Sequence, residues 1–187
     1  MTNCLVLGGN GMIGSHIVEQ LLAEGHSVRV FDNFTGRSNL QSVWEKVEKV
    51  SGDYLERSEV RKALQGIDTV FHSIHTTVPR TSIQKPLFDA ETNILPAIGL
   101  LQDAVKLGVK KVVYMSSIAV YGNPDRVPIM EEDEAKPASP YGVSKLAIEE
   151  YVRYFNRMYG LDYVILRPSA AYGERQNLSP HTGVVVN

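Results

Sequence analysis

Short apolar runs alternate with longer amphipathic stretches along most of the chain. The runs with the length and composition of buried strands are found at 3–7, 27–31, 47–51, 68–72, 111–116 and 163–166. The stretches with apolar residues at helical spacing are found at 12–23, 57–64, 87–106 and 139–159. This alternation predicts an α/β domain with a doubly wound parallel sheet covered by helices on both faces.

Composition and charge narrow the class of protein. The 187 residues suffice for one domain with a sizeable core, and their 43% hydrophobic and 21% charged content is ordinary. A net charge of -2 gives no electrostatic sign of nucleic-acid binding. The one cysteine, Cys4, excludes an internal disulfide and favours a reducing compartment. We expect a soluble cytoplasmic protein without a metal site.

The first predicted strand runs directly into a glycine-rich turn. Its glycines fit two registers, Gly8-x-x-Gly11-x-x-Gly14 and Gly9-x-Gly11-x-x-Gly14, which the sequence does not separate. Such a turn brings backbone N–H groups and the positive end of a helix dipole to a pyrophosphate. Asp32 ends the second predicted strand, where a carboxylate accepts hydrogen bonds from an adenosine ribose. The combination predicts a dinucleotide site.

A second motif points to redox chemistry on that dinucleotide. Ser139 and Pro140 form a helix-start signature, so Tyr141 and Lys145 lie one turn apart on one face. A free phenol needs roughly 4 kcal/mol to bring its pKa from about 10 to near 7. A Lys ammonium at ~4 Å supplies about that much at an effective dielectric of about 20. We therefore expect Tyr141 to act as the base beside Lys145, with Ser117 holding the substrate oxygen.

With these motifs the chain resembles extended short-chain dehydrogenase/reductases of the NAD-dependent nucleotide-sugar epimerase/dehydratase family. The resemblance covers the whole chain. It is carried by the segments 8–14, 32–33, 52–53, 68–72, 92–93, 116–122, 141–145, 167–168 and 172–173.

The resemblance implies a Rossmann fold that binds NAD, and it implies roles for particular residues. Asp53 and Tyr54 would flank the adenine, Asn93 would lie near the active site, and Pro168 would pack by the nicotinamide. For His72 and Arg167 a structural role and a site role both remain open. The full set of implied cofactor residues is Gly8, Gly11, Met12, Ile13, Gly14, Asp32, Asn33, Asp53, Tyr54, Ser73, Ile74, Asn93, Tyr141, Lys145 and Pro168.

Departures from the family pattern narrow the expected reaction. Sugar dehydratases carry an Asp-Glu pair where this chain has Ile118 and Ala119, and decarboxylating relatives place a Glu at the position of Ala119. The side chains of Ile118 and Ala119 cannot transfer protons. Reductive epimerases use a Cys near the active-site Ser, and Cys4 lies elsewhere in the sequence. What remains is 4-epimerisation with a retained NAD.

Two further substitutions concern the substrate. Ala170 stands where the family has an Asn that contacts the substrate diphosphate, and Pro96 replaces a common Gly. The preferred interpretation is an NAD-dependent sugar-nucleotide 4-epimerase that transiently oxidises the sugar at C4. One alternative is a carbonyl reductase or dehydrogenase acting on a non-nucleotide substrate. Another is a non-catalytic NAD-binding protein. Net release of reduced cofactor separates the reductase from the epimerase.

Two expectations concern the whole molecule. The resemblance implies a homodimer that pairs through the long helices at 87–106 and 139–159. Little sequence follows the sixth predicted strand, and it includes the apolar residues 184–186. We therefore expect residues 1–187 to be one dinucleotide-binding domain whose C-terminal substrate domain is missing. Such a chain would hold NAD without the surface that encloses a sugar nucleotide.

Overall fold

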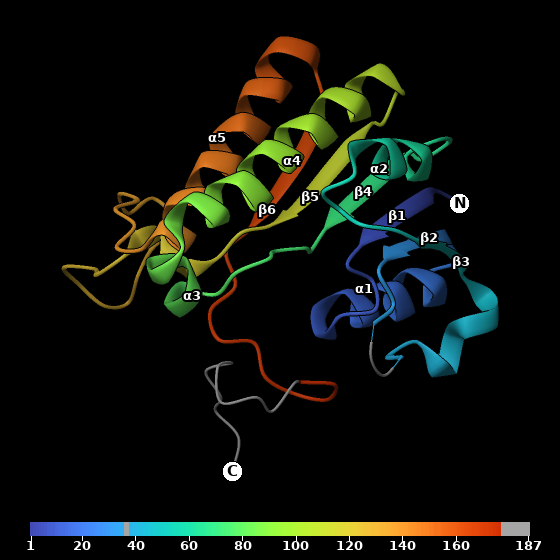
Figure 1. Ribbon diagram of the computed structural model, residues 1–187, viewed down its shortest axis with the longest axis horizontal. Coiled ribbons are helices and arrows are strands. Elements are labelled where there is room, and N and C mark those ends of the chain that lie inside the picture. Colours follow the sequence, from blue (N-terminus) through green and yellow to red (C-terminus); the bar gives the residue numbers. More distant parts are fainter. Residues whose placement is uncertain (36–37, 177–187) are drawn as a thin grey trace.

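The computed structural model describes residues 1–35 and 38–176, so the terminal residues 184–186 lie outside the described part. Six parallel strands form one sheet in the order β3-β2-β1-β4-β5-β6 (Figure 1). Strand order reverses between β1 and β4, and folds of this type bind their ligands at that switch point. The strands are β1 (Asn3–Leu7), β2 (Ser27–Asp32), β3 (Glu48–Ser51), β4 (Thr69–His72), β5 (Lys111–Met115) and β6 (Asp162–Leu166).

Helices flank the sheet, and the described ones include three short elements that the sequence pattern did not predict. In Figure 1, α2, α4 and α5 lie on one face and α1 lies on the other. The predicted helices are α1 (Met12–Ala23), α2 (Arg57–Ala63), α4 (Pro86–Lys106) and α5 (Pro140–Tyr159). The unpredicted ones are η1 (Gln41–Lys46), α3 (Pro79–Gln84) and η2 (Ile118–Tyr121). No described helix has both the length and the apolar character needed to cross a membrane.

The core is divided by the sheet because alternate side chains along a strand point to opposite faces. Leu5 and Leu7 of β1 belong to the large cluster that also contains residues of α2, α4 and α5. Val6, between them, belongs to a smaller cluster with Val18 of α1 and Val30 of β2. All five side chains are fully buried. The α/β doubly wound parallel sheet predicted from the sequence is confirmed.

Helices lie on both faces of the sheet as predicted, but within the described residues the face opposite α4 and α5 stays partly exposed at β6. On β6, Tyr163 and Ile165 pack against the large core cluster. Val164 and Leu166, on the opposite face of the same strand, are 39% and 43% exposed. The reason is the right-handed crossover of parallel strands. Beyond the switch point, the crossovers that carry α4 and α5 both fall on the same face of the sheet.

The start of α5 has the local geometry that its sequence predicts. The Ser139 hydroxyl accepts a hydrogen bond from the Gly142 backbone N–H at 3.2 Å, and Pro140 occupies the first turn. Gly160 ends the helix in the left-handed conformation, with φ of 70°. The Ser139 cap fixes where the helix begins, and therefore where Tyr141 lies, whereas Gly160 fixes where the helix ends.

Candidate dinucleotide and active site

The glycine turn after β1 is built around one carbonyl group. Gly8 has φ of 77°, and its carbonyl oxygen accepts a hydrogen bond from the Gly11 N–H at 3.0 Å. A Cβ atom added at Gly14 would lie 2.1 Å from that same oxygen, so α1 packs directly on the turn. The contacts join Gly8, Gly11 and Gly14, which favours the first of the two registers. Gly9 is also confined, because a Cβ there would lie 2.7 Å from Val30. Because these glycines carry no side chains, the backbone N–H groups of the turn are accessible to a pyrophosphate.

Asp32 lies at the end of β2 and is tied to the glycine turn. One of its carboxylate oxygens accepts a hydrogen bond from the Asn10 backbone N–H at 3.0 Å, and the other accepts one from Phe34 N–H at 3.1 Å. Asn33 is exposed, and its side-chain oxygen accepts a hydrogen bond from the Thr35 N–H at 3.2 Å. The carboxylate is thus held in a fixed orientation beside the turn.

Other implied cofactor residues lie around the same turn. The Ser73 hydroxyl donates to the Leu7 carbonyl at 2.7 Å. A Cβ at Gly8 would lie 2.9 Å from Ile74, so residues 73–74 stand against the turn across the switch point. Met12 and Ile13 form the first turn of α1. The Pro168 carbonyl accepts a hydrogen bond from the Ile118 N–H at 3.0 Å, which keeps this proline beside η2.

In the segment after β3, Asp53 lies in a turn and the side chain of Tyr54 is buried in the core. Asp53 caps the local turn, its carboxylate accepting a hydrogen bond from the Leu55 N–H at 2.9 Å. Tyr54 is 6% exposed and belongs to the large core cluster. Its hydroxyl and His72 Nε2 are 2.7 Å apart. The side chains of Tyr54 and His72 therefore belong to the core, and a contact of residue 54 with an adenine stays a prediction.

Ser117, Tyr141 and Lys145 meet at the carboxyl end of β5. Ser117 directly precedes η2, and its hydroxyl accepts a hydrogen bond from the Ala119 N–H at 3.1 Å. The Ser117 side chain also acts on the phenol of Tyr141, whose pKa it lowers. Lys145 is 4% exposed, and its Nζ donates to the Met115 carbonyl at 2.6 Å. The fold brings together three side chains from two separate segments of the sequence.

In the protein without cofactor, burial opposes the effect that the sequence predicts for Lys145 on the Tyr141 phenol. Burial raises the pKa of Tyr141 above 10, although the hydrogen bond with Ser117 acts in the opposite direction. Burial also lowers the pKa of Lys145 to about 7. The Lys145 Nζ lies 5.7 Å from the centre of the Tyr141 ring and is bonded to a backbone carbonyl. The ammonium is thus held at a backbone carbonyl, and burial is the dominant cause of the shift in the Tyr141 pKa.

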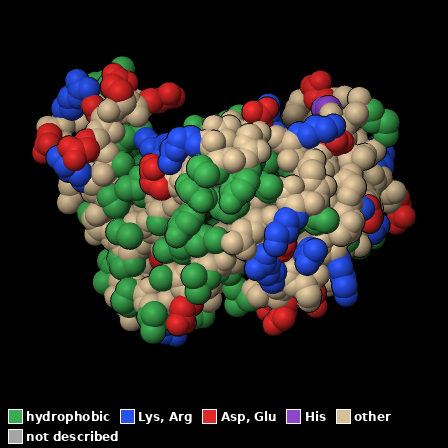
Figure 2. All heavy atoms as spheres, turned by 90° about the horizontal axis from the view of Figure 1, so that it is seen from above, with side chains coloured by type: hydrophobic (Ala, Val, Ile, Leu, Met, Phe, Trp, Pro, Cys, Tyr) green, Lys and Arg blue, Asp and Glu red, His purple; other side chains and the backbone are tan. Residues whose placement is uncertain are grey.

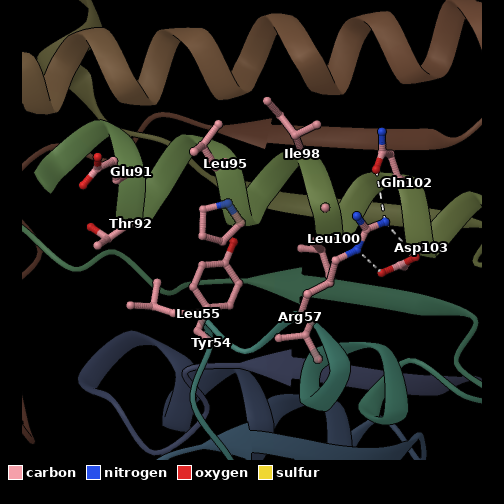
Figure 3. Close-up of a pocket in the computed structure, with 13 residues that line it drawn as sticks. Tyr54, Leu55, Arg57, Glu91, Thr92, Leu95, Ile98, Leu100, Gln102 and Asp103 are labelled. Carbon is pink, nitrogen blue, oxygen red and sulfur yellow. Dashed lines mark hydrogen bonds and ion pairs between the residues drawn. The ribbon is translucent and has the colours of Figure 1, made fainter. Parts of the chain in front are cut away.

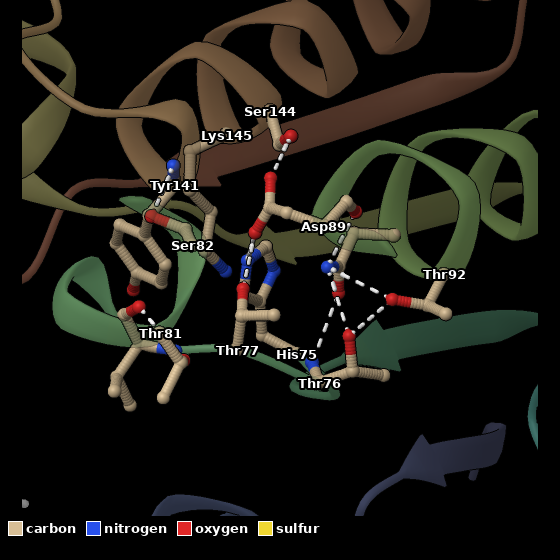
Figure 4. A network of polar contacts seen from close by, with 12 residues as sticks. His75, Thr76, Thr77, Thr81, Ser82, Asp89, Thr92, Tyr141, Ser144 and Lys145 are labelled. Atoms are coloured by element: carbon tan, nitrogen blue, oxygen red, sulfur yellow. Dashed lines mark hydrogen bonds and ion pairs between the residues drawn. The ribbon is translucent and has the colours of Figure 1, made fainter. Parts of the chain in front are cut away.

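A buried polar network under this site was missed from the sequence (Figure 4). Its centre is Asp89 of α4, which is 0% exposed. The Asp89 carboxylate accepts hydrogen bonds from the hydroxyls of Thr77 and Ser144. The His75 ring packs edge to face on Tyr141 with ring centres 4.7 Å apart. The feature of the sequence that could have predicted this network is the spacing of Asp89 and Asn93, which places both polar residues on the buried face of one helix.

Asn93 holds the chain after β4 in place and is not aimed at a cofactor. Its side-chain oxygen accepts a hydrogen bond from the Thr76 backbone N–H at 2.9 Å, and its Nδ2 donates to the Asp89 carbonyl at 2.8 Å. The residue is 2% exposed. Its expected position near the active site is observed, but its polar atoms are used to position residues 75–77.

Arg167 has the structural role that the sequence left open. Its guanidinium donates twice to the Glu149 carboxylate, at 2.9 and 2.5 Å, and lies 4.8 Å from the centre of the Tyr121 ring. Glu149 is fully buried and also accepts a hydrogen bond from Ser116 at 2.6 Å. This ion pair joins β6 to α5 one turn beyond Lys145, and so fixes the helix that carries the site.

A hollow beside α4 is separate from the proposed chemistry. A cavity of about 490 Å³ lies between α4 and the segment after β3 (Figure 3). Leu55, Leu95 and Arg57 are among the residues that line it, whereas Ser117, Tyr141 and Lys145 are not. Its wall is mainly the exposed side of α4, so it belongs to the outer surface of the helix layer.

Comparison with known proteins agrees with this geometry. Residues 4–186 match the model of the NAD dependent epimerase/dehydratase family. The UDP-glucose 4-epimerase of Lacticaseibacillus casei is 36% identical over 187 aligned residues, covering 94% of this chain and 56% of that protein.

Solved structures give the same result. The UDP-glucose 4-epimerase of Thermotoga maritima, determined with UDP-glucose, has a TM-score of 0.88 and 34% identity over 97% of this chain. The UDP-glucose 4-epimerase of Thermus thermophilus, determined with NAD, has a TM-score of 0.86 and 36% identity over 94% of this chain. This chain covers 60% and 57% of those two chains. It spans well under two thirds of the relatives it matches.

The fold and the comparisons converge. A glycine turn that excludes side chains, an acid at the tip of β2 and a Ser-Tyr-Lys set at the end of β5 occur together at one edge of the sheet. NAD is the cofactor of the matching family. The chain belongs to the NAD dependent epimerase/dehydratase family.

Proposed function

We propose that this chain supplies the NAD-binding and proton-transfer residues of a UDP-sugar 4-epimerase. The observation that carries the proposal is that Ser117, Tyr141 and Lys145 meet at the same edge of the sheet as the glycine turn. Bound NAD would supply reversible hydride acceptance. Tyr141 would take and return the proton of the sugar C4 hydroxyl, Ser117 would hold that oxygen, and Lys145 would hold the nicotinamide ribose.

The residues next to Ser117 favour epimerisation over dehydration. Ile118 and Ala119 begin η2, and the Ala119 N–H is bonded to the Ser117 hydroxyl. Neither side chain carries a transferable proton, and loss of water from a sugar needs both an acid and a base. Epimerisation needs no proton-transfer residue beyond Tyr141, because the proton that leaves the C4 oxygen returns to the same oxygen.

An assay on the full-length protein tests the proposal. Without added cofactor, we expect UDP-glucose or UDP-N-acetylglucosamine to be converted to its C4 epimer, followed by proton NMR of the sugar. Reduced cofactor should not accumulate, because each turnover returns the hydride. Net NADH formation with a simple alcohol would favour the reductase alternative. Tightly bound NAD without turnover of any sugar nucleotide would favour the non-catalytic one.

The proposal includes NAD in preference to NADP. Asp32 holds a fixed carboxylate at the tip of β2, and a 2′-phosphate there would face a like charge. A unit-charge pair near 4 Å costs about 4 kcal/mol at an effective dielectric of about 20. After screening, we expect a preference of roughly a hundredfold.

Titration calorimetry with both cofactors measures this preference directly. Asp32→Asn should narrow the gap by raising the affinity for NADP relative to NAD. The same variant also loses one acceptor for the N–H of Asn10 or Phe34, so NAD affinity should fall modestly. Equal affinities of the unmodified protein for NAD and NADP would refute the assignment of Asp32.

We further propose a cytoplasmic homodimer that pairs through α4 and α5. Hydrophobic side chains gather on the face of the molecule seen in Figure 2. On these helices Leu87, Leu95 and Met158 are 70%, 63% and 60% exposed, which is unusual for large apolar residues of a helix pair. Leu95 also lines the hollow of Figure 3, which would receive a side chain of the second copy. Sedimentation of Leu95→Glu against the unmodified protein tests the pairing.

A further inference from the structure

A carboxylate with no solvent exposure lies directly beneath the proposed proton-transfer residues. Asp89 is on the first turn of α4, and it is as fully buried as the apolar core. Burying an ionised carboxylate is costly unless it is paired with a cation or accepts several hydrogen bonds. The groups that surround Asp89 therefore decide what the residue does.

The direct partners of Asp89 are neutral. Two of its contacts are hydroxyls, of Thr77 and Ser144. The third is His75, whose Nε2 lies 3.7 Å from the carboxylate. That distance is within ion-pair range, but burial and the nearby Lys145 lower the pKa of His75 to about 2, so the imidazole is uncharged. None of these contacts neutralises the carboxylate.

Lys145 on α5 is the basic side chain whose charge interacts with Asp89 at longer range. Among the described residues, no Lys or Arg forms an ion pair with Asp89 within 4.0 Å. The field of Asp89 nevertheless acts on Lys145, raising its pKa against the stronger effect of burial. Figure 4 shows Asp89 and Lys145 in the same group of side chains as His75 and Tyr141. The titratable groups that face Lys145 are Asp89 on α4, Glu149 and Tyr141 on α5, His72 on β4, Tyr114 on β5 and His75 after β4.

We propose that Asp89 is the buried counter-anion of Lys145 and a positioning residue for the Tyr141–Lys145 pair. The inference rests on the proposed function only for the use of that pair. Through Ser144 the carboxylate also holds α5, and through Thr77 it holds the chain whose His75 packs on Tyr141. One carboxylate thus favours the charged form of the ammonium and positions the segment whose His75 ring packs on the phenol.

Asp89→Asn tests the proposal, because it removes the charge and keeps the shape. With selectively ¹³Cε-labelled lysine, the Lys145 resonance is identified by its loss in Lys145→Gln and titrated without substrate. We expect the pKa of Lys145 to fall by about 1 pH unit or more in Asp89→Asn, since an opposite charge has been withdrawn. This readout does not depend on turnover, so failure of the proposed function leaves it intact.

Asp103→Asn is the matched control. Asp103 is also a buried carboxylate on α4, at 1% exposed, but it pairs with Arg57 far from the site. Its substitution should destabilise the fold while leaving the titration of Lys145 in place. An unchanged Lys145 pKa in folded Asp89→Asn, or an equal shift in Asp103→Asn, would overturn the proposal.

A measurement on the unmodified protein covers the case in which Asp89→Asn does not fold. The ¹³Cγ resonance of Asp89 should show a step at the same pH at which Lys145 titrates, and the step should vanish in Lys145→Gln. Absence of that step in the unmodified protein would contradict the pairing directly.

Discussion

Replacing Gly14 by Ala should remove most of the affinity for NAD. The added Cβ would stand 2.1 Å from the Gly8 carbonyl oxygen and 2.9 Å from the Gly9 Cα, and these are backbone atoms that cannot turn away. The turn or the start of α1 must therefore move, and the N–H groups aimed at a pyrophosphate move with it. Overpacking of a rigid site costs ~1–3 kcal/mol or more. We expect NAD affinity to fall about a hundredfold in calorimetry.

Gly99→Ala provides the control for this prediction. Gly99 lies inside α4, and a Cβ there would meet only Arg57 side-chain atoms at 3.5 Å or more. Ala is favoured over Gly in a helix by about 1 kcal/mol, so stability should rise slightly and NAD affinity should stay unchanged. If Gly14→Ala bound NAD as tightly as Gly99→Ala, the glycine turn would not be the pyrophosphate site.

Tyr141→Phe should abolish epimerisation while the fold and the bound cofactor are retained. The change deletes one hydroxyl from a ring that keeps its packing on His75. A positioned acid or base contributes ~10²-fold or more, so turnover should fall by at least that factor. The measurement is the initial rate of C4 inversion by NMR, together with NAD content and the thermal unfolding midpoint.

Tyr151→Phe removes the same atom from the same helix at a site that is 39% exposed. Its turnover should match that of the unmodified protein. Because burial raises the pKa of the Tyr141 phenol in the absence of cofactor, we also expect activity to depend on the positive charge of bound NAD as well as on Lys145. Retention of more than about a tenth of the activity in Tyr141→Phe would exclude this residue as the base.

The sequence by itself determined the architecture and the chemical type of the site. Period-two and helical patterns are local properties, and they located the strands and the long helices of the described region. Ser139 and Pro140 encode a helix start within a few residues, so the placement of Tyr141 and Lys145 on one face was readable. The glycine turn and Asp32 were readable for the same reason, since each follows a strand directly.

The tertiary structure alone decided the electrostatics of the site and the coverage of the sheet. Asp89 and Lys145 lie on different helices, and their relation depends on how α4 and α5 pack. The pKa of Tyr141 is raised chiefly by its burial, which the spacing of residues along the sequence does not reveal. Tyr54, which follows β3, is a core residue whose hydroxyl lies within hydrogen-bond distance of His72 at the end of β4, and two strands separate β3 from β4 in the sheet order. Local sequence encodes backbone conformation, whereas desolvation and charge pairing are properties of side chains brought together only by the fold.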